Sequence, residues 1–275
     1  MIPRAHITAW RALAPWASDA QVEQDLVISR AIMEIFDEPF VRERLTFRGG
    51  TALQKLFLKI PVRYSEDIDL VQIQSEPIGK VLDKIRRKLD SWLGIPRWDK
   101  SKGSHTLTYK FDSEIAPIEP LRLKVEINTR EHFTVLGLKQ KSFSVESPWV
   151  RGTVSLQTYE LEELMGTKLR ALYQRKKGRD LFDLDHALKQ FPQLNCQKLI
   201  DCFMKYLEHE GLRITRAQFE SNMLEKMRST IFLSDISSLI RPGIQYDFET
   251  AYKHIHDLLI AKLPGESWKG NKNRE

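Results

Sequence analysis

The sequence has little cysteine and no long run of apolar residues. Cys196 and Cys202 are the two cysteines among 275 residues, which excludes a disulfide framework and a zinc site built on CxxC pairs. No apolar stretch approaches the roughly 20 residues that a membrane-spanning helix needs. The N-terminal segment also lacks the continuous apolar core of a signal peptide. These absences predict a soluble, cytoplasmic protein with reduced thiols and no membrane partner.

Motifs of several common enzyme classes are missing as well. The chain has no HExxH, no phosphate-binding loop with a Walker lysine and no GxSxG. Zinc hydrolases, P-loop enzymes and serine hydrolases are therefore excluded. His254 and His256 have no cysteine or carboxylate at a convincing ligand spacing.

The composition is that of a globular protein with a mild positive charge. Lysine and arginine outnumber aspartate and glutamate by 43 to 37, and 41% of the residues are hydrophobic. The chain can build one large core or two smaller ones. The excess of cations is a mild indication of a polyanionic partner, although a solvated surface explains it equally well.

The spacing of apolar residues predicts helices and strands in a definite order. Ser18 and Gln21 form a capping-box pattern at the start of the first helix. The predicted elements are a helix at 18–36, a strand at 45–47, a helix at 51–59, a strand at 67–73, a helix at 81–93, and strands at 105–112, 121–129 and 133–147. Beyond residue 156 the pattern is helical to about residue 261, and the polar tail from residue 264 is expected to be frayed. We therefore expect a mixed α/β domain at residues 1–156 and a helical domain at residues 157–275.

Two glycines and a threonine lie where a strand is predicted to turn into a helix. At such a turn Gly49 and Gly50 leave backbone N–H groups free to approach a ligand, and the helix N-terminus favours negative charge. With the hydroxyl of Thr51, they could bind phosphate. The alternative is a tight turn in which Thr51 caps the helix.

Two aspartates follow in the next strand, one residue apart. Because side chains alternate along a strand, Asp67 and Asp69 should project from one face, where paired carboxylates can hold Mg²⁺. The alternative is an edge strand with a charged outer face. Glu126, between Val125 and Ile127 in a later strand, is the candidate for a third metal ligand, or else the partner of a basic neighbour.

A second dense stretch, KLRALYQRKKGRDLFDL, runs from Lys168 to Leu184. Lys168 lies beside the apolar stripe of its helix and could bind a triphosphate as a point charge. The cations that could follow a nucleic-acid backbone are Arg175, Lys176, Lys177 and Arg179. The alternative is a solvated cluster that complements the helix C-terminus, with Asp180 and Asp183 as caps of the next helix.

Taken together, FRGGTALQKLF, RYSEDIDLV, LKVEIN and KLRALYQRKKGRDLFDL closely resemble the AbiEii family of bacterial nucleotidyltransferase toxins, to which the MenT toxins also belong. The resemblance spans about Asp19 to Lys189. It implies an α+β fold with a polymerase-β-like nucleotidyltransferase core, in which a small mixed sheet is followed by a helical C-terminal domain. Members of this family transfer a nucleotide from an NTP and release pyrophosphate, in the MenT branch to tRNA 3′ ends. They are paired with an antitoxin.

The resemblance also implies roles for individual residues. The nucleotide-binding glycine motif falls on Gly49, Gly50 and Thr51, and the catalytic, metal-binding DxD motif falls on Asp67 and Asp69. The motif lysine, which is catalytic and nucleotide-binding, falls on Lys168, and the late catalytic aspartate falls on Asp180.

The sequence thus leads us to expect a Mg²⁺-dependent nucleotidyltransferase toxin whose acceptor is the 3′ end of tRNA. Two alternatives stay open. One is an enzyme of the same fold that modifies a small molecule or a protein hydroxyl, and the other is a non-catalytic module that binds RNA or an NTP.

Overall fold

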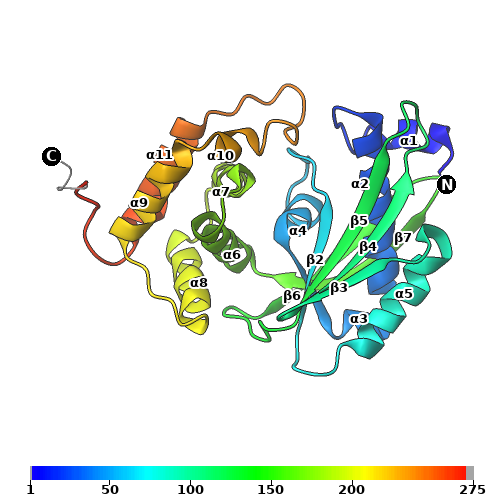
Figure 1. Ribbon diagram of the computed structural model, residues 1–275, viewed down its shortest axis with the longest axis horizontal. Helices are drawn as coiled ribbons and strands as arrows, with labels where there is room; N and C mark the ends of the chain where they lie inside the picture. The colour runs from blue at the N-terminus through cyan, green and yellow to red at the C-terminus, as the bar shows by residue number, and fades with distance from the viewer. Residues whose placement is uncertain (1, 271–275) are drawn as a thin grey trace. The chain divides into compact units, whose positions relative to one another are not determined.

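A computed structural model describes residues 2–270 and divides into two compact units (Figure 1). The first unit reaches from the N-terminus to Tyr159 and includes Ile240–Gly243, which joins it through an antiparallel bridge between Ile240 and Arg63. The second unit comprises Glu160–Leu239 and the residues from Ile244 onward. The first unit extends past residue 156 because its last strand continues to Tyr159.

The first unit contains both helices and strands, and its last five elements are all strands. Its helices are α1 (Arg4–Trp10), α2 (Asp19–Asp37), α3 (Pro39–Arg42), α4 (Gly49–Leu56) and α5 (Gly79–Leu93). Its strands are β1 (Leu45–Arg48), β2 (Asp67–Gln72), β3 (Arg97–Ser101), β4 (Ser104–Asp112), β5 (Pro120–Asn128), β6 (Leu138–Glu146) and β7 (Arg151–Tyr159). Strands β3 and β7 are additions to the elements expected from the sequence.

The strands form one seven-stranded mixed sheet in the order β3-β4-β5-β2-β1-β7-β6. β2 runs parallel to β5, and β1 runs parallel to β7, while the other neighbours are antiparallel. Helix α2 packs on several strands and α5 packs on β4 (Figure 1). They cover the face that carries Ile68, Leu70 and Val125, each of which is fully buried or nearly so. Because side chains alternate, Asp67 and Asp69 of β2 point to the other face, which also carries the buried Val71. The mixed sheet and the α+β class expected from the sequence are confirmed.

The start of α2 shows how closely local sequence determines local structure here. The Ser18 hydroxyl accepts the Gln21 N–H at 3.2 Å, and the Gln21 side chain accepts the Ser18 N–H at 3.4 Å. This reciprocal pair is the predicted capping box, which satisfies two backbone donors that a helix start leaves unpaired.

The second unit is helical, as expected. Its elements are α6 (Leu161–Gln174), α7 (Gly178–Gln190), α8 (Cys196–His209), α9 (Arg216–Met227), α10 (Thr230–Ser234), α11 (Phe248–Leu258) and a short 3₁₀ turn (Ile260–Lys262). Helix α6 packs against α7 and α8, and α7 packs against α11. The end of the tail that was expected to be frayed, residues 271–275, lies outside the described residues.

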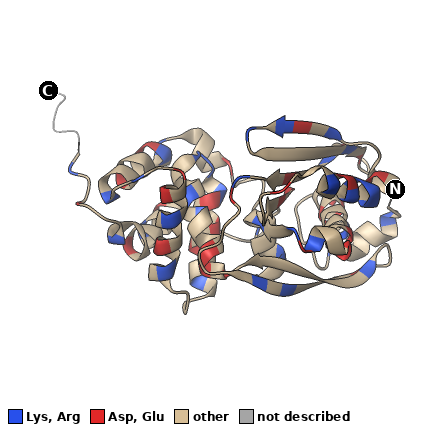
Figure 2. Cartoon of the chain, turned by 90° about the horizontal axis from the view of Figure 1, so that it is seen from below, with Lys and Arg blue, Asp and Glu red and all other residues tan. Residues whose placement is uncertain are grey.

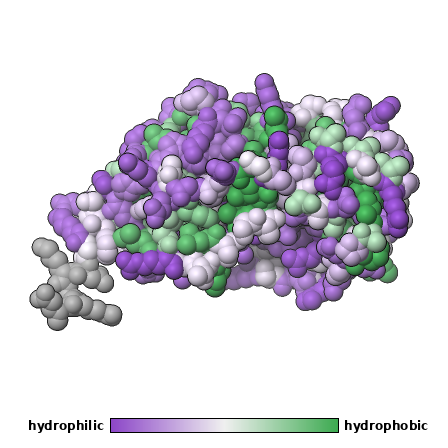
Figure 3. All heavy atoms as spheres, turned by 90° about the horizontal axis from the view of Figure 1, so that it is seen from above, coloured by the Kyte–Doolittle hydropathy of each residue, from purple (hydrophilic) through white to green (hydrophobic). Residues whose placement is uncertain are grey.

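No helix within residues 2–270 combines the length and the apolar character needed to cross a membrane. The face drawn in Figure 3 is largely hydrophilic, with apolar areas between the polar side chains.

A buried carboxylate joins the N-terminal segment, α2 and α4. Asp25 accepts the indole N–H of Trp10 at 2.8 Å and that of Trp16 at 3.1 Å. Its Oδ1 also pairs with Lys55 Nζ of α4 at 2.6 Å. Asp25 is 2% exposed, so all three partners compensate a charge that water cannot reach.

We expect Asp25→Ala to lower the free energy of unfolding by about 3 kcal/mol, because it leaves Lys55 and two indole donors without their partner. Urea unfolding followed by tryptophan fluorescence measures this loss. The control is Asp99→Ala, which removes an exposed pair with Arg97 and should cost less than about 1 kcal/mol. Equal losses in the two variants would contradict the role given to Asp25.

Candidate active site

The turn from β1 to α4 brings a helix N-terminus against an aspartate. Gly49 has φ +83°, and a Cβ at this position would overlap the carboxylate of Asp69. Only glycine fits there, because both the backbone conformation and the space exclude a side chain. Helix α4 begins at Gly49, two residues before the expected start, and its N-cap residue Arg48 makes no side-chain cap. The first turn of α4, with the N–H groups that a helix start leaves unpaired inside the helix, therefore lies against the carboxylate of Asp69.

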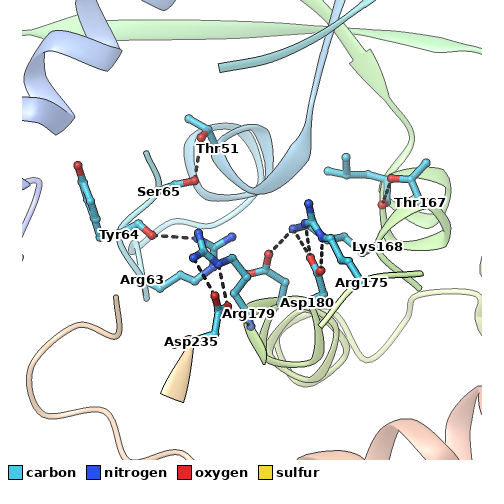
Figure 4. A network of polar contacts seen from close by, with 12 residues as sticks. Thr51, Arg63, Tyr64, Ser65, Thr167, Lys168, Arg175, Arg179, Asp180 and Asp235 are labelled. Carbon is cyan, nitrogen blue, oxygen red and sulfur yellow. Dashed lines mark hydrogen bonds and ion pairs between the residues drawn. The ribbon is translucent and has the colours of Figure 1, made fainter. Parts of the chain in front are cut away.

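Thr51 is the third residue of α4 and does not cap it, so the simple turn with Thr51 as N-cap is wrong. Its hydroxyl lies 2.8 Å from Ser65 Oγ and also donates to the carbonyl oxygen of Asp67. Figure 4 shows Thr51 and Ser65 side by side. These bonds fix the glycine turn against the start of β2.

Asp67 and Asp69 lie at the start of β2, on the face opposite Ile68 and Leu70, as the alternation predicted. Partial burial and the charge of Asp69 raise the pKa of Asp67 to about 6 from an ordinary value of 3.8. The two carboxylates thus repel each other in a poorly solvated place. A divalent cation would relieve that repulsion.

Glu126 lies on the same face, because it is the register partner of Asp69 on the neighbouring parallel strand β5. Its Oε2 pairs with Lys124 Nζ at 2.6 Å, and its Oε1 accepts the Ser104 hydroxyl at 3.3 Å. Burial alone would raise the pKa of Glu126, but the bond to Lys124 lowers it. Within residues 2–270 no three Asp, Glu, His or Cys side chains converge as a metal site. The structure therefore shows the salt bridge, and Glu126 as a third metal ligand stays a prediction.

A second constellation, in the helical unit, is built around Lys168 of α6. Its Nζ lies 3.1 Å from Asp180 Oδ1 and 2.8 Å from Asp183 Oδ2, and both aspartates are fully buried. Figure 4 shows Lys168 beside Asp180 and Arg175. Burial would raise the pKa of Asp180, but the charges of Lys168 and Arg175 lower it. The alternative that Asp180 and Asp183 cap α7 is wrong, because the N-cap residue is Lys177 and the side chain that accepts a backbone N–H of the first turn, that of Arg179, is Asp235. Lys168 is itself buried within the helical unit.

The basic cluster at the end of α6 is largely paired within its own unit. Arg175 binds Asp180 through two nitrogens, at 2.7 and 2.8 Å. Arg179 binds Asp235 at 2.9 and 3.0 Å, and Lys177 Nζ lies 3.3 Å from the same carboxylate. Lys176 is exposed and forms no ion pair within residues 2–270.

Sequence reasoning did not single out several residues of these sites. Those that touch the candidate residues are Ser65, Lys124 and Asp235, while Asp183 was considered only as a helix cap. Lys124 lies two residues from Glu126 on β5, and Asp183 follows Asp180 by three residues on α7, so each pair shares a face. Ser65 precedes Asp67 by two residues, just before β2 begins. Asp235 is 56 residues from Arg179, and nothing local indicated it.

The raised pKa of Asp67 gives a stability prediction with a definite sign. Between pH 3.8 and about 6 the folded state holds a proton that the unfolded state has released, so unfolding becomes easier as pH rises. We expect Asp67→Asn to raise the free energy of unfolding at about pH 7.5 by up to about 3 kcal/mol, and to change little near pH 3.5. Urea unfolding at both pH values in EDTA measures the difference.

Glu126→Gln is the matched control, because the pKa of Glu126 is shifted the other way. Because the pKa of Glu126 is lowered in the folded state, its carboxylate stabilises the fold at pH values above its ordinary pKa. That stabilisation is lost as the pH falls through the lowered pKa. Glu126→Gln should therefore destabilise the protein at neutral pH. Shifts of the same sign in both variants would contradict the electrostatics described here.

Known proteins carry the same architecture. The chain matches solved structures of MenT4, a nucleotidyltransferase toxin from Mycobacterium tuberculosis H37Rv, with a TM-score of 0.66 and 17% identity over 96% of this chain and 91% of that one. It matches JHP933 from Helicobacter pylori with a TM-score of 0.51 and 16% identity over 88% and 91%. These likenesses show the fold. None of the curated proteins compared matches the chain.

The family model described as "Nucleotidyl transferase AbiEii toxin, Type IV TA system" matches residues 30–254. That range contains the glycine turn, the aspartate pair and the constellation around Lys168. The chain therefore belongs to the AbiEii family of nucleotidyltransferase toxins of type IV toxin–antitoxin systems.

Proposed function

We propose that this protein is a Mg²⁺-dependent enzyme that transfers a nucleotide from an NTP to the 3′ end of tRNA and releases pyrophosphate. In the reaction the acceptor hydroxyl releases its proton to solvent and its oxygen bonds to the α-phosphorus, while the bond from that phosphorus to the bridging oxygen breaks and pyrophosphate leaves. Catalysis of such a transfer consists mostly of positioning and charge neutralisation.

The observation that carries this proposal is the contact between Asp69 and Gly49. It joins the two halves of a nucleotide site, a helix N-terminus that can bind phosphate and a pair of carboxylates that can bind a cation. In this proposal the outer phosphates of the NTP bind the backbone N–H groups of Gly49 and Gly50. Thr51 is the third residue of this phosphate-binding motif.

The donor set of β2 fits a hard divalent cation. Asp67 and Asp69 supply carboxylate oxygens, and burial together with the charge of Asp69 raises the pKa of Asp67, a shift that a cation beside the two carboxylates would oppose. When bound there, Mg²⁺ would neutralise charge on the phosphates. Glu126 would join as a ligand if Lys124 released it, and we keep that as part of the proposal.

Lys168 is proposed to neutralise charge on the triphosphate, and Asp180 is proposed to orient Lys168. The support is the geometry within the second unit, where two buried aspartates hold the Lys168 ammonium group in one place. Such positioning restricts a flexible four-carbon side chain before substrate arrives.

The basic cluster is proposed to guide RNA, with Arg175, Lys176, Lys177 and Arg179 as its members. Lys176 is the best supported of the four, since it is exposed and unpaired within residues 2–270, whereas the other three already bind carboxylates. We further propose that the protein acts in the cytoplasm, where NTPs and tRNA occur, and that a cognate antitoxin counteracts it.

The direct test incubates the protein and Mg²⁺ with each α-labelled NTP and total cellular RNA. We expect label in one discrete RNA band, and a loss of at least about 100-fold with Asp67→Asn or Lys168→Met. The matched control is Lys189→Met, which removes a half-exposed lysine paired with Asp185 in the same helical unit. It should keep the activity.

Each outcome of this assay has a defined meaning. Label in a protein or small-molecule fraction would replace the RNA acceptor by that class. If no NTP labels any fraction, the enzyme proposal fails. Melting curves of each variant show whether a loss of activity reflects unfolding.

Metal binding can be tested without turnover. At a Mg²⁺ concentration ten times its Kd, binding should stabilise the unmutated protein by about 1.4 kcal/mol. Asp67→Asn should abolish this gain, whereas Asp99→Asn, on the exposed edge strand β3, should retain it. Thermal unfolding with and without Mg²⁺ measures the gain, and an equal gain in all three proteins would contradict a metal site at Asp67.

A further inference from the structure

The face of the sheet that carries Asp67 continues across three more strands to the free edge at β3. Asp67 lies opposite Lys124 on β5, Lys124 lies opposite Thr108 on β4, and Thr108 lies opposite Arg97 on β3. Residues directly opposite each other share a face. With about 4.8 Å between strands, Arg97 lies about 14 Å from Asp67. A cross-strand row of alternating cationic and hydroxyl groups therefore leads from the candidate active site to the sheet edge.

A second pair of cations extends the same face. Lys110 and Arg122 are register partners, each two residues from a member of the first row, so they point the same way. Both are exposed, and neither forms an ion pair within residues 2–270. The acids on this face of the three strands are Glu126 and Asp99, which pair with Lys124 and Arg97, and Asp112 at the end of β4.

The chemistry of this face suits a polyanion better than a protein. Strands β3, β4 and β5 are described throughout, and Pro120 is their single non-polar residue on this side. Protein interfaces usually have an apolar centre, which is missing here. The hydroxyls of Thr106 and Thr108 can donate hydrogen bonds to phosphate oxygens between the cations. Helices α2 and α5 pack on the other side, which carries Leu107 and Val125.

We propose that this cationic face, formed by Arg97, Thr108, Lys110, Arg122 and Lys124, is a track for the phosphate backbone of single-stranded RNA leading to Asp67 and Asp69. Lysines and arginines occur along the strands as well as the helices (Figure 2). The inference rests on the proposed function, because it names where the acceptor strand of that reaction lies. It locates RNA contacts in the first unit, beyond those proposed for Lys176 and its neighbours.

The test measures RNA binding separately from transfer. A fluorescent single-stranded RNA of about 12 nucleotides is titrated with protein in EDTA, without NTP, and its anisotropy is followed. The track variant combines Arg97→Gln, Lys110→Gln and Arg122→Gln. The control removes the same charge from the other side of the sheet through Lys80→Gln and Arg87→Gln on α5 and Lys100→Gln on β3.

We expect the track variant to bind at least about tenfold more weakly near 0.1 M salt, and its log–log salt slope to be smaller by about 2. The control should stay within about twofold of the unmutated protein. NTP binding by calorimetry should be unchanged in both. Equal weakening of the two variants, undiminished binding by the track variant, or no RNA binding by the unmutated protein would each overturn the proposal.

Cross-linking of the unmutated protein provides a measurement that does not depend on variant folding. RNA containing 4-thiouridine should cross-link to peptides within residues 97–128. Cross-links confined to residues 175–179 would overturn the track. If cross-links fall on the track while no NTP is transferred, the proposed reaction fails and the RNA-binding face stands.

Discussion

The repulsion between Asp67 and Asp69 is the constraint on which the first unit depends. Two carboxylates on one strand face are tolerated because Asp69 lies against the N-terminal turn of α4, where the helix dipole favours negative charge. That contact requires glycine at position 49. It also requires that α4 stay in place, which the Thr51 hydroxyl ensures at one end and the Asp25–Lys55 pair ensures at the other. Burial and the remaining repulsion from Asp69 still raise the pKa of Asp67. The fold is thus less stable than it could be at the place where a cation would bind, as is common at functional sites.

The same strand periodicity that builds the core also builds the functional face. Alternate residues of β2 and β5, such as Ile68 and Val125, are buried under helices, while Asp67 and Glu126 point the other way. Register then sets which polar groups meet. Because Asp69 is opposite Glu126 and Asp67 is opposite Lys124, the two carboxylates of β2 face one acid and one base on β5. A slip of β2 by one residue would put Asp67 and Asp69 into the core, so the packing of the apolar face fixes the chemistry of the polar one.

Local patterns were read correctly from the sequence where one physical cause dominates. The capping box at Ser18 and the shared face of Asp67 and Asp69 follow from helix and strand geometry alone. The unexpected strand β3, RWDKS, is exposed throughout, so no apolar alternation could indicate it, and pairing with β4 decides its structure. The alternative that Asp180 caps α7 was wrong for a different reason. A carboxylate in the first turn of a helix looks the same whether it caps that helix or binds a lysine 12 residues earlier, and only tertiary packing distinguishes the two.

Clusters of cations in a sequence do not by themselves measure the charge available to a polyanion. In the helical unit, Lys168 and Arg175 both pair with Asp180, and Lys177 and Arg179 both pair with Asp235. Most cations of that dense basic stretch therefore already form ion pairs within the unit. In the sheet, cations that are scattered along the sequence come together across strands, and two of them carry no internal partner within residues 2–270. Binding RNA through paired cations would first require breaking bonds to buried carboxylates, which costs several kcal/mol for each charge left uncompensated. Unpaired, exposed cations on an open strand face carry no such cost. The electrostatic argument therefore favours the sheet as the main contact for a phosphate backbone, although the helical cluster is the more conspicuous of the two in the sequence.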